Sequence, residues 1–171
     1  MALLRFGQIT NAEVYFEDNT LVGMVKEFKI PKIAWQSIDH ETLGQVAVWK
    51  APARPMQALE GSVKFGFVDP DVAAMTYMPT RAWRFQIHHD VDVWGQDGLD
   101  TDKSYKLVTA VRLLFTESEL GGAKLGDLVE HDAPFTCTRF VQRVYSEQTP
   151  LIGVDVMANR IWGKYGDPWP E

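Results

Sequence analysis

The sequence has few of the residues and segments from which disulfide-linked and membrane proteins are built. Its 171 residues include one cysteine, Cys137, so no disulfide can form within the chain and a reducing cytosol is indicated. It has no stretch of about 18 apolar residues, which excludes a transmembrane helix. The first residues lack the basic start and long apolar centre of a signal peptide. We therefore expect no membrane segment and no leader.

Positive charge is also in short supply. Lys and Arg together number 17 against 23 Asp and Glu, which gives a net charge of −6. This balance argues against a surface that grips nucleic acid through its phosphates. With 46% hydrophobic and 23% charged residues, the composition is ordinary for a globular protein. The length fits a single domain over residues 1–171 with its own core.

Sequence motifs of the common enzyme classes are absent. There is no phosphate loop, nucleophile elbow or dinucleotide fingerprint. His88, Asp90 and Asp92 share one side of an expected strand, but neighbours there are about 6.5 to 7 Å apart, too wide for one small ion. Cys137 has only Arg139 nearby to activate it, so a small buried residue is the simpler interpretation. We expect no catalytic residue, no metal site and no cofactor; an enzyme would have to rest on the His88 cluster.

Strand signals dominate what is present. Two long runs, Tyr105–Thr116 and Phe135–Tyr145, are rich in β-branched and aromatic residues and contain no Gly or Pro. Further strands are expected over Ala12–Glu17, Leu21–Ile30, Gln57–Val68, Ala82–Trp94, Leu151–Met157 and Arg160–Trp162. The first two of these should pair as a hairpin through the turn at 18–20. A polar loop is expected over 95–103.

One short helix completes the predicted elements. Asp69 is a good N-cap and Pro70 a good first helical residue, which predicts a helix over about 70–78 that Pro79 ends. Residues 1–11 are expected to form an irregular arm, and residues 163–171 an extended tail. The pattern predicts a mainly β fold, a sandwich or barrel of seven or eight strands with one helix.

The second long run does not separate into an apolar and a polar side. Strict alternation places Phe135 and Cys137 with Arg139, Val141 and Arg143, and it leaves a second mixed side opposite. Such a strand is either covered on both faces or borders something polar. This favours a sheet that faces a polar channel or a partner.

Residues 32–55 form a predicted long loop that is too apolar for a solvated linker. Its apolar residues are Trp35, Ile38, Leu43, Val46, Val48 and Trp49. Packing against a neighbouring subunit is the favoured interpretation, and these six residues are the candidate interface. The alternative is a loop that covers the core of its own domain.

Taken in order, several segments resemble the major tail tube proteins of contractile-tailed bacteriophages. The segments are Asn11–Phe16, Leu21–Ile33, Met56–Glu60, Phe67–Val72, Gly121–Asp127 and Arg139–Met157, and together the likeness runs from about residue 9 to 163. The chain departs from the family pattern at the turn Asp18–Thr20, in the loop at Asp39–Gly44 and near the C-terminus. Each motif alone is weak, whereas their order and spacing are specific.

The resemblance implies a structural virion protein rather than an enzyme. It implies hexameric rings that stack into the hollow inner tube of the tail, with the strands of all subunits joined into one inner β-barrel. The implied partners are the sheath protein, baseplate hub, tail terminator and tape-measure protein, with DNA passing through without specific binding. Assembly in the host cytoplasm and location in the virion tail follow. An acidic bore that repels DNA phosphates is a hypothesis from the net charge.

Two other functions remain open from the sequence. The tube of a type VI secretion system, or of a related contractile injection machine, would use the same ring fold to carry protein effectors. A monomeric barrel that binds a small ligand would instead contain one apolar cavity.

Overall fold

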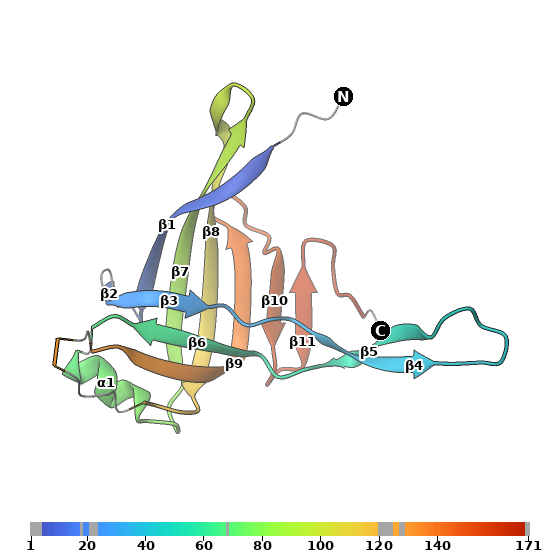
Figure 1. The fold of residues 1–171 in the computed structure, drawn as a ribbon, viewed down its shortest axis with the longest axis horizontal. Helices are drawn as coiled ribbons and strands as arrows, with labels where there is room; N and C mark the ends of the chain where they lie inside the picture. The colour runs from blue at the N-terminus through green and yellow to red at the C-terminus, as the bar shows by residue number, and fades with distance from the viewer. Residues whose placement is uncertain are drawn as a thin grey trace.

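A computed structural model describes residues 5–17, 19–20, 24–67, 69–119, 125–126 and 129–169. As the sequence predicts, this part of the chain is mainly β with one short helix (Figure 1). Its elements are β1 (Phe6–Phe16), β2 (Asn19–Thr20), β3 (Val25–Lys29), β4 (Trp35–His40), β5 (Trp49–Met56), β6 (Glu60–Phe65), α1 (Pro70–Thr76), β7 (Trp83–Gly95), β8 (Gly98–Phe115), β9 (His131–Val144), β10 (Ile152–Asp155) and β11 (Arg160–Gly163). Within the described ranges no helix has the length and apolar character to cross a membrane.

The long strands form one antiparallel sheet in the order β11-β10-β9-β8-β7-β1-β2. The predicted pairing of the two longest runs is confirmed, with Leu107 opposite Val144 and Phe115 opposite Phe135. The polar loop expected over 95–103 is wrong, because β7 and β8 are joined by a tight turn in which Gly95 pairs with Gly98. Gly98 has a φ of +108°, a conformation that glycine adopts without steric cost.

A smaller layer crosses this sheet. β6 pairs with the first part of β9, and β3 pairs with β6. Further along the same strand, β9 pairs with β10 instead. Strand β9 therefore belongs to both layers, and in Figure 1 β3 and β6 run across β7 and β8. The result is a half-open sandwich.

The predicted hairpin between the first two strands is wrong. β1 pairs with β7 from Phe6 to Phe16, whereas it meets β2 only at Tyr15 and Phe16. β3, which begins at Val25, pairs with β6. An alternating sequence pattern identifies a strand but not the strand with which it pairs. Here core packing determines the pairing, because Phe16 of β1 lies against Phe85 of β7 with ring centroids 5.0 Å apart. Asp18 and residues 21–23 of the predicted hairpin lie outside the described residues, as do residues 120–124 and 127–128 of the connector.

A β-bulge in β9 explains its mixed sides. Arg112 of β8 pairs with Arg139, but the next residue, Leu113, pairs with Cys137, so Thr138 is extra. An inserted residue reverses which side the following residues face. Phe135 and Cys137 therefore face the core before the bulge and Phe140 after it, while Arg139 is exposed. The single alternating side expected for 135–145 is wrong.

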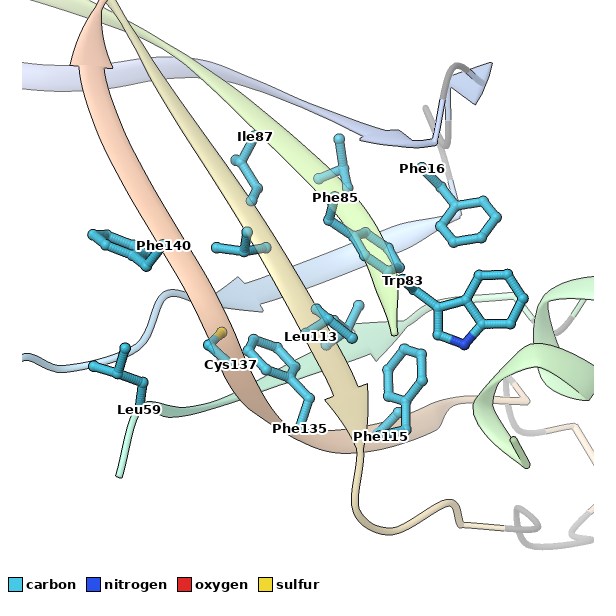
Figure 2. Close-up of a cluster of buried hydrophobic side chains, with 14 of the residues drawn as sticks. Phe16, Leu59, Trp83, Phe85, Ile87, Leu113, Phe115, Phe135, Cys137 and Phe140 are labelled. Carbon is cyan, nitrogen blue, oxygen red and sulfur yellow. The ribbon is translucent and has the colours of Figure 1, made fainter. Parts of the chain in front are cut away.

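The core lies between the two layers. Figure 2 shows the side chains of Phe16, Phe85, Leu113, Phe115 and Phe135 gathered between the long strands and the crossing strands. Val63 and Phe65 of the small layer and Val72 and Met75 of α1 complete it. Helix α1 starts as predicted, because the Asp69 side chain accepts a hydrogen bond of 2.8 Å from the backbone N–H of Asp71. It ends at Thr76, two residues short of the predicted end.

Both irregular segments expected from the sequence contain strands. β1 begins at Phe6, so residues 6–11 of the expected N-terminal arm belong to the sheet. The loop expected over 32–55 is a two-stranded arm, β4 paired with β5, which projects from the body in Figure 1. Its strand pattern was hidden because Pro52 and Pro55 sit inside β5 and the register shifts between Trp35 and Ser37.

Candidate assembly surfaces

The β4–β5 arm carries the six candidate interface residues. Leu43 and Val46, at its tip, are fully exposed. Ile38, Val48 and Trp49 are 55%, 49% and 63% exposed. Trp35, at the base of the arm, is half-buried. In the part of the chain that the structure describes, the other five side chains face solvent in the single subunit.

The arm is fixed to the body at its base. The ring of Trp169 meets Trp35 edge-on, with centroids 5.7 Å apart. This contact folds the C-terminal segment back against β4, so the tail expected to be extended is docked at residue 169. Further out, His40 stacks on Trp49 across the two strands at 5.4 Å. Cross-strand contacts of this kind stiffen a two-stranded ribbon.

The large sheet is open at both sides. Within the described part of the chain, no strand pairs with the outer edge of β11, and β2 covers only the last two residues of β1. The uncovered length of β1 includes Phe6 and Ile9, which are 59% and 60% exposed. Long edges with apolar side chains pair readily with another chain.

The face of the large sheet that points away from the core is polar and basic. Register places Arg84, Arg112 and Arg139 side by side on β7, β8 and β9. The charged residues of this face are Lys106, Arg84, Arg112, Arg139, Arg143 and Arg160, with Glu13, Glu17, Asp90, Asp92 and Asp155. Six bases against five acids do not support the hypothesis of an acidic wall, if this face borders a bore. Sequence reasoning missed the row because it depends on register across three strands.

The His88 cluster is engaged in ordinary contacts. Asp90 lies 3.4 Å from the ammonium of Lys106 and accepts a hydrogen bond of 3.3 Å from Asn11. Burial, and then the charge of Lys106, lowers the pKa of His88 below its usual value. Among the residues that the structure describes, no group of three or more His, Cys, Asp or Glu is placed to hold a metal ion.

Two buried side chains that could be reactive, Cys137 and His131, are engaged in core packing and in hydrogen bonds. Cys137 lies in the core, where burial raises the pKa of its thiol to about 12, far above that of a nucleophilic cysteine. His131 is 3% exposed, and its Nε2 lies 3.1 Å from Thr76 Oγ1 and 3.2 Å from Ser118 Oγ. These contacts tie the end of α1 to the start of β9.

Three solved structures share the fold. A chain of the PVC sheath–tube complex, from an extracellular contractile injection system in its extended state, has a TM-score of 0.55 at 10% identity, covering 80% of this chain and 90% of that one. A chain of the PVC sheath/tube terminator scores 0.54 at 12% identity, covering 80% and 95%. The tube-terminating cap of the anti-feeding prophage scores 0.53 at 12% identity, covering 78% and 87%.

Comparison with individual curated proteins gives no match. The sequence profile of a family does match: the family described as phage tail tube protein FII aligns with residues 7–163. This span includes every strand from β1 to β11 apart from Phe6, and it agrees with the tube-related fold and with the resemblance in the sequence. The chain therefore belongs to the phage tail tube protein FII family, a family of structural tail components rather than enzymes.

Proposed function

We propose that copies of this chain form hexameric rings that stack into the hollow inner tube of a contractile phage tail. DNA would leave the capsid through the bore of this tube. Family membership supports the tail tube role. The ring, its sixfold symmetry and the surrounding sheath are the parts that we propose.

The observation that carries the ring is the unfinished large sheet. Its edge strands β1 and β11 expose backbone groups that a neighbouring copy can pair with, and pairing around a ring would remove every open edge. Each subunit would offer β1 on one side and β11 on the other. Such a head-to-tail contact closes into a ring when the rotation between copies is suitable.

The arm provides the second contact. The six candidate interface residues would pack on an adjacent copy, which would remove their apolar surface from water. They are Trp35, Ile38, Leu43, Val46, Val48 and Trp49. The other interpretation, a segment that covers its own core, fits poorly because the arm projects from the body (Figure 1). The remaining partners would be the sheath protein, baseplate hub, tail terminator and tape-measure protein. Residues 1–171 would act as one domain, assembled in the host cytoplasm and located in the virion tail.

A tube of a contractile injection system is the second candidate. It is favoured by the fold shared with the PVC and anti-feeding prophage structures. Neighbouring genes would separate the two, because capsid and terminase genes accompany a phage tail and a secretion ATPase accompanies an injection machine. A small-ligand barrel is disfavoured, since the large sheet ends at β11 and β2 and does not close on itself in the described part of the chain. The cavity beneath α1, beside Phe65 and Met75, measures only about 10 Å³.

Negative-stain electron microscopy of the purified protein tests the proposal. We expect rings with sixfold symmetry, or tubes with a central hole, at concentrations in the micromolar range or above. Particles that stay monomeric when tail initiation complexes are added would contradict it. Native mass spectrometry would give the number of subunits independently.

A further inference from the structure

Four arginines converge on a concavity in the exposed face of the large sheet. Arg84, Arg112 and Arg139 stand opposite one another on three neighbouring strands, which lie about 4.8 Å apart. Arg143 follows Arg139 on the same side of β9, about 13 Å along the strand. All four are exposed.

The concavity has the size and lining of an anion site. Its volume is about 420 Å³, and the amides of Gln86 and Gln148 add hydrogen-bond donors to the four guanidinium groups. Its floor is made of Val108, Ala110 and Val141, which are small side chains. Because long basic side chains surround a floor of small apolar side chains, the concavity has room for an anionic ligand that would neutralise the arginines.

The arginines are only partly neutralised. Arg84 Nε lies 3.3 Å from Glu17 Oε2, and Arg139 Nε lies 4.0 Å from Asp155 Oδ2. For Arg112 and Arg143, the described residues offer no carboxylate within 4.0 Å. A face with an excess of bases on a chain of net charge −6 requires the acids to be elsewhere. Three of them, Asp97, Asp100 and Asp102, lie at or near the β7–β8 turn.

We infer that this arginine concavity binds the phosphate backbone of nucleic acid. Guanidinium groups form paired hydrogen bonds with phosphate oxygens, and a row of them follows a chain of phosphates. Phe85 is the aromatic residue of this lining, but it is 2% exposed and packs in the core, so it offers no platform for bases. Contacts would therefore go to the backbone and would not select sequence. The inference rests on the proposed function for its setting: in a tube, this face would border the bore and hold passing DNA weakly.

Weak holding is compatible with passage. The face has only one more base than acids, which implies few phosphate contacts, and each contact on a single strand contributes a salt dependence of about −0.7 in log K against log salt. Binding should therefore be clear at low salt and slight at physiological salt. The strand would be guided by this wall instead of being repelled by it.

The test uses fluorescein-labelled dT20 and the purified full chain, by fluorescence anisotropy at about 20 and 150 mM NaCl. The double variant Arg112→Gln/Arg143→Gln should weaken binding by about tenfold at the lower salt and reduce the salt slope by about one to two. The matched control, Lys50→Gln/Arg54→Gln, removes the same charge from the arm and should bind as the wild type does. Arg143→Lys, which keeps the charge but loses the paired hydrogen bonds, should be intermediate.

Three results would overturn the inference. Unchanged binding in the double variant would show that the arginines are not the site. Equal losses in the double variant and the control would show a general charge effect. Tighter binding of labelled polyglutamate than of dT20, lost in the same double variant, would assign the face to an acidic peptide.

Microscopy of the same samples separates this inference from the proposed function. Rings that fail to bind dT20 would overturn only the inference. Subunits that bind dT20 through the arginines and never form rings would overturn the tube proposal and leave the binding site in place.

Discussion

Gly61 of β6 lies directly opposite Phe135 of β9, and a Cβ on Gly61 would come within 2.5 Å of the Phe135 ring. The carbonyl oxygen of Lys29 closes the other side. Because Phe135 is almost fully buried and cannot move aside, Gly61→Ala should lower the free energy of unfolding by about 1–3 kcal/mol. Urea unfolding followed by tryptophan fluorescence measures this.

Gly66 provides the matched control for that substitution. It follows β6, and its added Cβ would lie 3.6 Å from Lys26 Cβ, an ordinary contact. Gly66→Ala should change stability by less than about 0.5 kcal/mol. Similar values for the two variants would mean that the close approach at Gly61 is relieved by small backbone shifts.

Glu130 should stabilise the protein at neutral pH and stop doing so in acid. Its carboxylate accepts hydrogen bonds from Lys26 at 2.5 Å and from Lys64 at 2.8 Å, which lowers its pKa from 4.5 to about 2. A pKa that is lower in the folded state contributes stability above the unfolded value and loses it as pH falls to about 2. Glu130→Gln should therefore be less stable than wild type at pH 7, with the gap closing between about pH 5 and 2.

Stability curves at several pH values check this prediction, provided that the wild type unfolds reversibly over the range. Glu41→Gln, on the exposed arm and without a lysine partner among the described ion pairs, is the control. A constant difference between Glu130→Gln and wild type across the range would contradict the assigned charge contacts.

Cys137 should be inert in the folded protein. It is 4% exposed, and its thiol has a pKa of about 12, so almost no thiolate is present at pH 8. A thiol reagent such as DTNB should react with this cysteine only after the chain unfolds, at a rate that follows the opening of the core. Rapid stoichiometric reaction of the native protein would show that β9 opens easily.

The arm tip should matter for assembly and not for folding. Leu43→Asp/Val46→Asp places charge on two fully exposed positions, so the unfolding free energy should change by less than about 0.5 kcal/mol. Rings or tubes should nevertheless be lost in negative stain, because the apolar contact with the neighbour would have to bury two carboxylates. Tyr165→Asp, also fully exposed, should still assemble. Loss of assembly in both variants would remove the special role of the arm.

Local pattern was enough to find most strands, the helix start and the long β8–β9 pair. Asp69, Pro70 and the alternation of Phe85 and Ile87 are signals carried by neighbouring residues, and the core uses them as expected. The local sequence pattern did not indicate which strands pair with each other. β1 pairs with β7 because Val14 and Phe16 complete the core beside Ile87 and Phe85, a contact that spans about 70 residues of sequence.

The surfaces were predicted unevenly. The arm was identified as a candidate interface from its apolar residues alone, although its strands were not, because Pro52 and Pro55 suppress the usual β signal. The arginine row was not identified, since the bulge at Thr138 decides which side Arg139 faces and one extra residue leaves no clear trace in the sequence.

Strand β9 bonds to β8 along one edge and to β6 and then β10 along the other. Separating the two layers would therefore require breaking rows of backbone hydrogen bonds and not only apolar side-chain contacts. Backbone hydrogen bonds between strands resist such a force together, whereas apolar side-chain contacts separate one after another. A tail that contracts against a cell envelope transmits a thrust along its axis, and a strand common to both layers would spread that thrust through the whole subunit.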